Sequence, residues 1–224
     1  MDVPPEKPTG NASRGLRADG EATRARILEA AGELFAAGGY ADTTSKAIAA
    51  RAGVDQASIN YHFGSRSGLY QALLADAHRR LVSLADLRQL AESRLAPAQK
   101  LRTLIEQLVQ RATGSTQGWH LKVLVREILA PSPHCQTLFQ EEIFPKVFFV
   151  RRLISEITAI PEDDPAITRC LLSVMAPCLM LLLGTSGIPG PVQELLRMPG
   201  EALSEHLHRY ALAGLTAIAQ EHAG

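Results

Sequence analysis

A run of apolar residues from position 170 to position 183 constrains the fold of this chain more than any other feature. Asp164 and Pro165 stand before it, and a helix-capping residue followed by proline is typical of a helix start. A helix that is apolar on every side must be covered by other helices or by lipid. The run is shorter than the roughly 20 residues that span a bilayer, and it contains Pro177. We therefore expect other helices to bury it, with no membrane contact.

Helical periodicity accounts for most of the remaining chain. Apolar residues recur every three to four positions, which is typical of helices, and no segment shows the convincing alternation of a strand. Aromatic residues make up only 5% of the chain, which also favours helix over sheet. Glycine, proline and capping residues divide the pattern into helices at about 21–37, 45–52, 56–63, 66–84, 97–113, 121–129, 137–158, 165–183 and 201–222, with a kink at Pro145 and a loop at 184–200. The predicted fold class is all-α, without internal repeats.

The length of 224 residues allows one large domain or a small domain followed by a medium one. Residues 1–20 are rich in proline, glycine and charge, so they are predicted to form a flexible N-terminal tail. The chain carries 23 basic and 23 acidic residues, a balance that neither supports nor excludes a nucleic-acid partner. No apolar signal segment precedes the fold, so we expect a cytoplasmic protein in which Cys135, Cys170 and Cys178 are reduced thiols.

The segment 44–63 reads as two short helices joined by a turn that contains Gly53. Helices of about two turns bury little surface alone, so they must pack on the helix before them. The apolar residues available for this packing are Ile48, Val54, Ile59 and Phe63, facing Leu34 and Phe35. Such an arrangement leaves one face of the second short helix exposed. In a helix-turn-helix, that helix enters the major groove of DNA.

The exposed positions of this segment carry side chains suited to DNA. Gln56, Ser58 and Asn60 are able to read base edges, and Ala57 lies among them. The helix start at Thr44 and Ser45 suits phosphate, because backbone N–H groups point outward there. The predicted DNA-binding residues are completed by side chains for backbone contacts, namely Tyr61, His62 and Arg66.

Residues 26–35 (RILEAAGELF), 39–54 (GYADTTSKAIAARAGV) and 57–69 (ASINYHFGSRSGL) resemble the DNA-binding signature of the TetR family. The resemblance covers about residues 21–70 without a gap. It implies a three-helix DNA-binding head at 21–66, and a larger helical domain at 67–224 that begins with a connecting helix, binds a small-molecule effector and forms a homodimer. It also favours repression, since most regulators of this family are repressors.

Four positions depart from the pattern of that family. Asp55 and Gln56 stand where the family commonly has Ser-Lys, Arg66 stands where it has lysine, and Asn60 takes the place of a frequent tyrosine. Asp55 would repel phosphate if it faced DNA, so the sequence leaves its orientation open. These changes affect the operator that is read rather than the fold.

The second domain is expected to hold an apolar pocket with a few polar groups. The candidate lining residues are Trp119, His120, Arg126, Phe139, Phe144, Phe148, Phe149 and Met175. Arg126 is a charge on an otherwise apolar helix and needs a partner. We expect it to pair with an anionic ligand or with a carboxylate of the helix that carries Glu141 and Glu142.

The last two long helices are predicted to form the dimer interface as a four-helix contact. The interface residues expected from their apolar faces are Leu171, Val174, Cys178, Leu182, Leu207, Tyr210, Gly214, Leu215 and Ile218. A dimer would place two recognition helices about 34–36 Å apart, or a multiple of this distance, and so match a palindromic operator in double-stranded DNA. An effector that prefers another separation would shift the protein away from DNA.

Two alternatives use other residues. A metal- or redox-responsive regulator of the same fold could use His134, Cys135, Cys170, Cys178, His206 and His208, but their spacing fits no metal site well. An enzyme is the least favoured alternative, because the chain lacks a phosphate loop, a nucleophile elbow and an HExxH motif. We therefore predict no catalytic residue, no metal and no cofactor.

Overall fold

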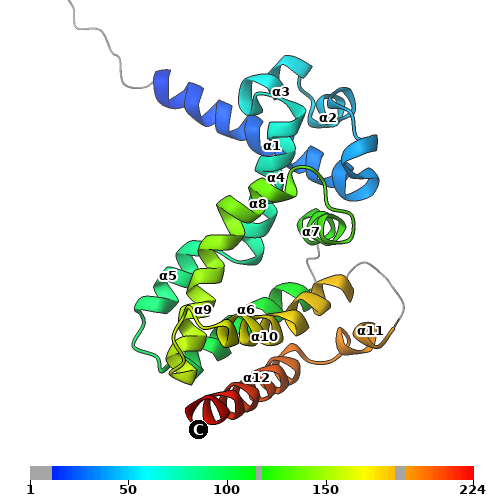
Figure 1. The fold of residues 1–224 in the computed structure, drawn as a ribbon. Coiled ribbons are helices and arrows are strands. Elements are labelled where there is room, and N and C mark those ends of the chain that lie inside the picture. Colours follow the sequence, from blue (N-terminus) through cyan, green and yellow to red (C-terminus); the bar gives the residue numbers. More distant parts are fainter. Residues whose placement is uncertain (1–11, 115–117, 185–189) are drawn as a thin grey trace, which may run out of the picture. The chain divides into compact units, whose positions relative to one another are not determined.

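The computed structural model describes residues 12–114, 118–184 and 190–224, with side chains from residue 18 onward (Figure 1). All regular elements in these ranges are helical and none is a strand, as predicted. The chain divides into two compact units, residues 1–73 and residues 74–224. We call them the head unit and the body unit. The boundary lies inside a helix rather than at its start near residue 66, because the first half of that helix packs into the core of the head unit.

From residue 12 onward, the head unit contains three helices and the first half of a fourth. These are α1 (Ala12–Asp42), α2 (Ser45–Ala52), α3 (Gln56–Phe63) and α4 (Arg66–Leu81). Its core consists of fully buried apolar side chains from all four helices, among them Ile27, Phe35, Ile48, Ile59, Leu69 and Leu73. An aromatic cluster adds to it, since the Tyr70 ring lies 4.8 Å from the rings of both Phe35 and Tyr40.

Local signals in the sequence set the ends of the short helices. The Oγ1 atom of Thr44 accepts a hydrogen bond from Ala47 N at 3.1 Å and caps α2. Gly53 ends α2 in the left-handed conformation with φ of 64°, which favours glycine. Gly39 has φ of 78° and interrupts α1 where the sequence predicts its end.

The first helix begins earlier than predicted. Residues 12–20 were assigned to a flexible tail, but they belong to α1. Alanine, arginine and leucine in this stretch favour helix, and an internal glycine weakens a helix by about 1 kcal/mol without ending it. Residues 1–11 of the predicted tail lie outside the described residues.

In the described residues of the body unit, α4 is followed by eight further α-helices and one π-helical segment. These are α5 (Leu84–Glu92), α6 (Pro97–Thr113), α7 (Trp119–Leu129), α8 (Cys135–Leu138), the π-helical η1 (Phe139–Ile143), α9 (Phe144–Thr158), α10 (Pro165–Gly184), α11 (Pro191–Leu195) and α12 (Gly200–Ala223). One helix was predicted over residues 66–84, but α4 ends at Leu81. Ser83 then starts α5, because its Oγ accepts a hydrogen bond from Asp86 N at 3.3 Å.

The apolar helix α10 lies within the helical body. It packs against α6, α7, α9, α11 and α12. The burial predicted for it is partial, because Leu172, Leu179 and Met180 are exposed. The helix runs unbroken through Pro177. Among the described residues, α10 is the one helix long and apolar enough to cross a membrane, a property that buried core helices share.

The kink expected at Pro145 takes the form of a π-helical turn. The segments α8, η1 and α9 follow one another without a loop, and Pro145 lies in the first turn of α9 (Figure 1). Proline lacks the N–H that would continue the helical hydrogen bonds, so the preceding turn adopts a wider pattern. This turn places Glu142 beside α4, as described below.

Candidate functional site

One face of α3 is anchored and the other is exposed. Ile59 is fully buried in the core of the head unit, whereas Gln56, Ala57, Asn60 and Tyr61 are exposed. The Tyr61 side chain is 85% exposed, a high value for an aromatic residue. Two amide side chains and a phenol on one short helix can donate and accept hydrogen bonds at base edges and phosphates.

Asp55 caps α3, and this answers the question of its orientation. Its Oδ1 accepts hydrogen bonds from Ser58 N at 2.7 Å and from Ser58 Oγ at 2.5 Å. These bonds from Ser58 lower the pKa of Asp55, so the carboxylate is charged at neutral pH. Ser58 was predicted to read bases, but it is half-buried and its hydroxyl donates to Asp55. The start of α3 therefore does not suit phosphate, and the start of α2 is the better candidate.

At the start of α2, Thr44 is exposed and Ser45 is half-buried. The next residue, Lys46, is also exposed and brings a positive charge to this turn. Sequence reasoning did not include Lys46 among the DNA-binding residues. The available signal was its position directly after Ser45 in the first turn of a helix.

Arg66 and His62 make contacts within the head unit. Arg66 Nη1 donates to the carbonyl oxygens of Thr43 at 2.6 Å and Tyr40 at 3.2 Å, and the guanidinium lies 4.3 Å from the centre of the Tyr40 ring. Arg66 thus ties the start of α4 to the end of α1. His62 is half-buried, with its ring 5.0 Å from that of Tyr61.

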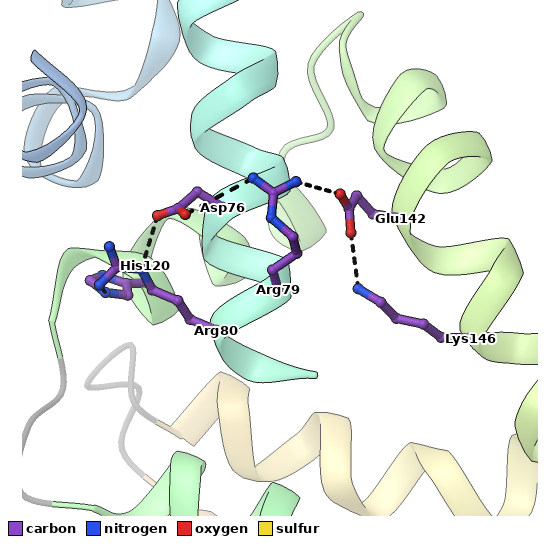
Figure 2. A network of polar contacts seen from close by, with 6 residues as sticks. All are labelled: Asp76, Arg79, Arg80, His120, Glu142 and Lys146. Atoms are coloured by element: carbon purple, nitrogen blue, oxygen red, sulfur yellow. Dashed lines mark hydrogen bonds and ion pairs between the residues drawn. The ribbon is translucent and has the colours of Figure 1, made fainter. Parts of the chain in front are cut away.

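In the body unit, charged side chains form a connected network around α4 (Figure 2). Glu142 of η1 accepts hydrogen bonds from Arg79 at 2.6 Å and from Lys146 at 3.1 Å. Asp76 pairs with Arg80 at 2.9 Å and lies 4.0 Å from Arg79. The network therefore joins α4 to η1 and α9 through side chains distant in sequence.

Lys146 is the most buried charge of this network, with 5% of its surface exposed. Burial lowers its pKa, although the hydrogen bond and charge of Glu142 raise it. The Lys146 ammonium also lies 2.8 Å from Nδ1 of His78. Burial and the charge of Lys146 lower the pKa of His78 to about 4. Near neutral pH His78 is therefore uncharged, and Nδ1 accepts the hydrogen bond from Lys146.

An open groove of about 840 Å³ runs along α10 and α12. Its lining is mostly apolar and includes Cys170, Val174, Tyr210, Gly214 and Ile218. The Tyr210 side chain is 71% exposed and Ile218 38% exposed. The outer face of these helices thus presents an apolar surface together with a recess.

Comparison with known proteins decides the family. The family model "Bacterial regulatory proteins, tetR family" matches residues 27–73. The model "HTH-type transcriptional dual regulator CecR, C-terminal domain" matches residues 97–218, more than half of the chain. The chain belongs to the TetR family of bacterial regulatory proteins.

Individual members of the TetR family are similar over part of the chain. The HTH-type transcriptional activator FasR of Mycolicibacterium smegmatis is 33% identical over 116 residues, which cover 52% of each protein. The HTH-type transcriptional regulator TtgR of Pseudomonas putida is 36% identical over 95 residues, covering 42% of this chain and 45% of TtgR. The matched stretches thus span about half the length of these relatives.

A solved structure shows the same fold. The transcriptional regulator FadR from Bacillus subtilis, in complex with stearoyl-CoA, superposes with a TM-score of 0.66 at 16% identity. The superposition covers 85% of this chain and 98% of that chain. The TetR fold, a helix-turn-helix head followed by a helical body, therefore extends over most of the molecule.

The residues predicted to line an effector pocket of this TetR-family protein separate into two sets. Trp119 is buried, and His120, Phe149 and Met175 are half-buried. Phe139, Phe144 and Phe148 lie on the surface, with 43%, 50% and 64% of each exposed, so they do not line an enclosed pocket. The sequence did not show which of these rings face the interior and which face solvent, because the π-helical turn shifts the helical phase between η1 and α9.

The partner expected for Arg126 stays a prediction. Arg126 is exposed, and the buried charge of α7 is its neighbour Glu127, which accepts hydrogen bonds from Ser132 N at 2.9 Å and Ser132 Oγ at 2.7 Å. Glu142, one of the two carboxylates proposed for Arg126, pairs with Arg79 and Lys146. Apolar residues surround both positions in the sequence, so periodicity alone did not tell which of them faced inward.

The predicted dimer residues also divide. Tyr210, Gly214 and Ile218 are exposed, and Leu171 and Leu207 are half-buried. Those that are largely buried within this chain are Val174, Cys178, Leu182 and Leu215, although Val174 and Leu215 still line the groove. Exposed apolar residues of α10 that the sequence analysis did not name are Leu172, Leu179 and Met180. A helix that is apolar on every side gives no signal for its outer face.

The cysteines give little support to redox or metal sensing. Burial raises the pKa of Cys178 to about 11, and burial also raises the pKa of Cys170 and Cys135. The three thiols are thus mostly protonated at neutral pH, which makes them weak nucleophiles and weak metal ligands. Within the described ranges, no three His, Cys, Asp or Glu side chains gather as a metal site would require.

Proposed function

We propose that the protein is a cytoplasmic, sequence-specific DNA-binding regulator of transcription, which acts as a repressor and leaves its operator when a small molecule binds the body unit. The observation that carries the proposal is the polar, exposed face of α3, held by buried Ile59 in a head that matches the TetR family. In this proposal α3 lies in the major groove, where Gln56 and Asn60 contact base edges. Thr44, Ser45 and Lys46 at the start of α2 contact phosphates. The family is one of regulators, which supports a protein without catalytic activity.

A selection from fragmented genomic DNA of the source organism tests this function. The full chain should retain a few fragments that share a palindrome, and retention should fall as salt rises because phosphate contacts release counterions. Asn60→Ala should reduce or change the selected set, whereas Gln89→Ala, an exposed substitution on α5, should not. Equal retention of all fragments by the unmodified chain would contradict sequence-specific binding.

Substitutions of Thr44 separate its capping role from its proposed phosphate contact. Thr44→Ala should lower the stability of the head unit by about 1 kcal/mol through loss of the cap, and it should weaken operator binding. Thr44→Asp keeps a capping oxygen but adds a negative charge, so it should preserve thermal stability and still weaken binding. Ser83→Ala removes the equivalent cap from α5 in the body unit and serves as the control. If Thr44→Asp bound the operator as well as the original protein, phosphate would not lie at this turn.

We also propose that a second copy of the chain covers the groove of α10 and α12. A dimer would bury the exposed Tyr210 and Ile218, together with Leu172 and Met180. A palindromic operator requires such a pair of heads.

Ile218→Glu tests this interface. A charge buried against an apolar partner surface should raise the dimer dissociation constant by at least about tenfold, which corresponds to 1.4 kcal/mol. Leu95→Glu is the control, since Leu95 is similarly exposed, at 42%, in the connection between α5 and α6. Sedimentation velocity at several concentrations measures both. Equal dissociation constants for the two variants would place the interface elsewhere.

The class of effector is part of the proposal. FadR of Bacillus subtilis, which shares the fold, was solved with stearoyl-CoA. We propose that the body unit likewise binds an amphipathic molecule with an apolar part and a polar head. A reporter gene behind the selected operator tests the sign of regulation: repression predicts higher expression when the regulator gene is deleted, and lower expression would indicate activation.

A further inference from the structure

Trp119 contains a buried donor that none of the surfaces described above uses. The Trp119 side chain lies in the first turn of α7 with 6% of the residue exposed. Its Nε1 is buried and has no hydrogen-bond partner among the described residues. An unpaired buried N–H is unfavourable and uncommon, so this position calls for an acceptor.

A cationic side chain lies beside the indole ring. The Arg80 guanidinium carbon is 5.8 Å from the centre of the Trp119 ring. Arg80 Nη1 is 2.7 Å from Nε2 of His120 (Figure 2). The His120 ring in turn lies 4.2 Å from the ring of Trp119. Because a guanidinium only donates, His120 Nε2 accepts here and its proton is carried by Nδ1. Trp119 and Arg80 thus bring two hydrogen-bond donors to the same cluster as the His120 ring.

The start of α7 adds a helix dipole to this cluster. Gly118 is the N-cap and carries no charged side chain. The N-terminus of a helix favours an anion through the helix dipole. A Cβ atom at position 118 would lie 3.2 Å from the His120 ring, so glycine allows the imidazole to lie over the helix start.

The charges of the surrounding network also favour an anion. Three cations, Arg79, Arg80 and Lys146, face two carboxylates, Asp76 and Glu142, and each carboxylate serves two cations. The network therefore carries one positive charge in excess when the histidines are neutral. Within the described part of the chain, the one counterion of Arg80 is the shared carboxylate of Asp76, at 2.9 Å.

We propose that Trp119 Nε1, Arg80 and the N-terminus of α7 bind the anionic head group, a carboxylate or a phosphate, of an amphipathic effector. This inference rests on the proposed function, in which the body unit binds such a molecule. An anion at Arg80 competes with Asp76 for the guanidinium, and Asp76 then becomes available to Arg79. Binding at α7 is in this way linked through Arg79 and Glu142 to η1 and α9.

The sole tryptophan of the chain allows a direct test on the full-length protein. Decanoate, decyl phosphate and decanol are titrated separately while Trp119 fluorescence is recorded. At least one of the two anions should give a saturable change and bind about tenfold or more tightly than decanol, the worth of one charge-assisted hydrogen bond. The comparison of the two anions decides between carboxylate and phosphate. Binding of decanol as tightly as both anions, or no saturable change with either anion, would overturn the proposal.

Two variants test the named groups. Arg80→Gln should weaken anion binding by about tenfold, and Arg102→Gln is the control, because Arg102 is similarly exposed and paired with Glu106 on α6. Trp119→Phe keeps an aromatic ring but removes the N–H, and it should weaken anion binding severalfold in calorimetric titrations. Circular dichroism confirms folding of each variant, and unchanged anion affinity in Arg80→Gln would also overturn the proposal. Because the titrations contain no DNA, their failure is distinguishable from failure of operator selection.

Discussion

Glu142→Gln is expected to lower the free energy of unfolding of the body unit by about 3 kcal/mol, because it leaves the buried ammonium of Lys146 without a counterion. Lys146 is 5% exposed, and its other close polar contact is the neutral His78 ring. Glutamine keeps the size of the side chain and one acceptor oxygen. The loss therefore reports the missing charge rather than a cavity.

Urea unfolding followed by Trp119 fluorescence measures this loss, since the only tryptophan lies in the body unit. Glu106→Gln is the matched control: Glu106 pairs with Arg102 on α6, and both side chains are well exposed. Exposed pairs contribute between 0 and about 1 kcal/mol, so the control should change little. The double variant Glu142→Gln with Lys146→Met removes both charges and should recover much of the stability. Equal losses of stability in Glu142→Gln and the control would mean that solvent already stabilises the charge of Lys146, so that Glu142 is not needed as its counterion.

The head unit could be predicted closely from the sequence because its signals are local. Thr44 and Gly53 bound α2, and the buried positions of α3 follow from helical spacing with Ile59 at the centre. The capping role of Asp55 was available in principle, since aspartate before a short helix is a common cap. The resemblance to TetR regulators placed Asp55 in the DNA-binding segment, and the sequence left open whether its side chain faces DNA.

The polar network of the body unit could not be predicted in this way. Arg79 and Glu142 are 63 residues apart, and His78 and Lys146 are 68 residues apart. No local pattern links residues so distant, and the π-helical turn that turns Glu142 toward α4 changes the helical phase between them. The spacing of Glu142 and Lys146, four residues apart, was the one local signal for a pair. Periodicity also failed where a whole helix is apolar, as with the outer face of α10.

Lowering the pH from about 7 to 4 is expected to destabilise the body unit by about 3 kcal/mol, because His78 must remain neutral in the folded state. Burial and the charge of Lys146 lower the pKa of His78 from 6.5 to about 4, while Glu142 opposes this shift. A depressed pKa means that the unfolded chain binds the proton more strongly. The stabilisation is therefore complete above pH 6.5 and is lost as the pH falls from 6.5 through about 4. The other charges near His78 are Asp76 and Arg79 on α4, which pair as described above.

His78→Gln distinguishes this residue from general acid denaturation. Glutamine accepts a hydrogen bond from Lys146 but does not titrate, so the slope of stability against pH should be strongly reduced between pH 6.5 and 4.5. Burial raises the pKa of Glu142, but the hydrogen bonds and charges of Lys146 and Arg79 lower it below the ordinary 4.5, so the loss from this carboxylate develops mainly below this range. His206→Gln is the control, because His206 is exposed on α12 and should leave the slope unchanged. If His78→Gln and His206→Gln retained the same slope, the proton taken up on unfolding would belong to another group, and Lys146 would not depend on a neutral His78.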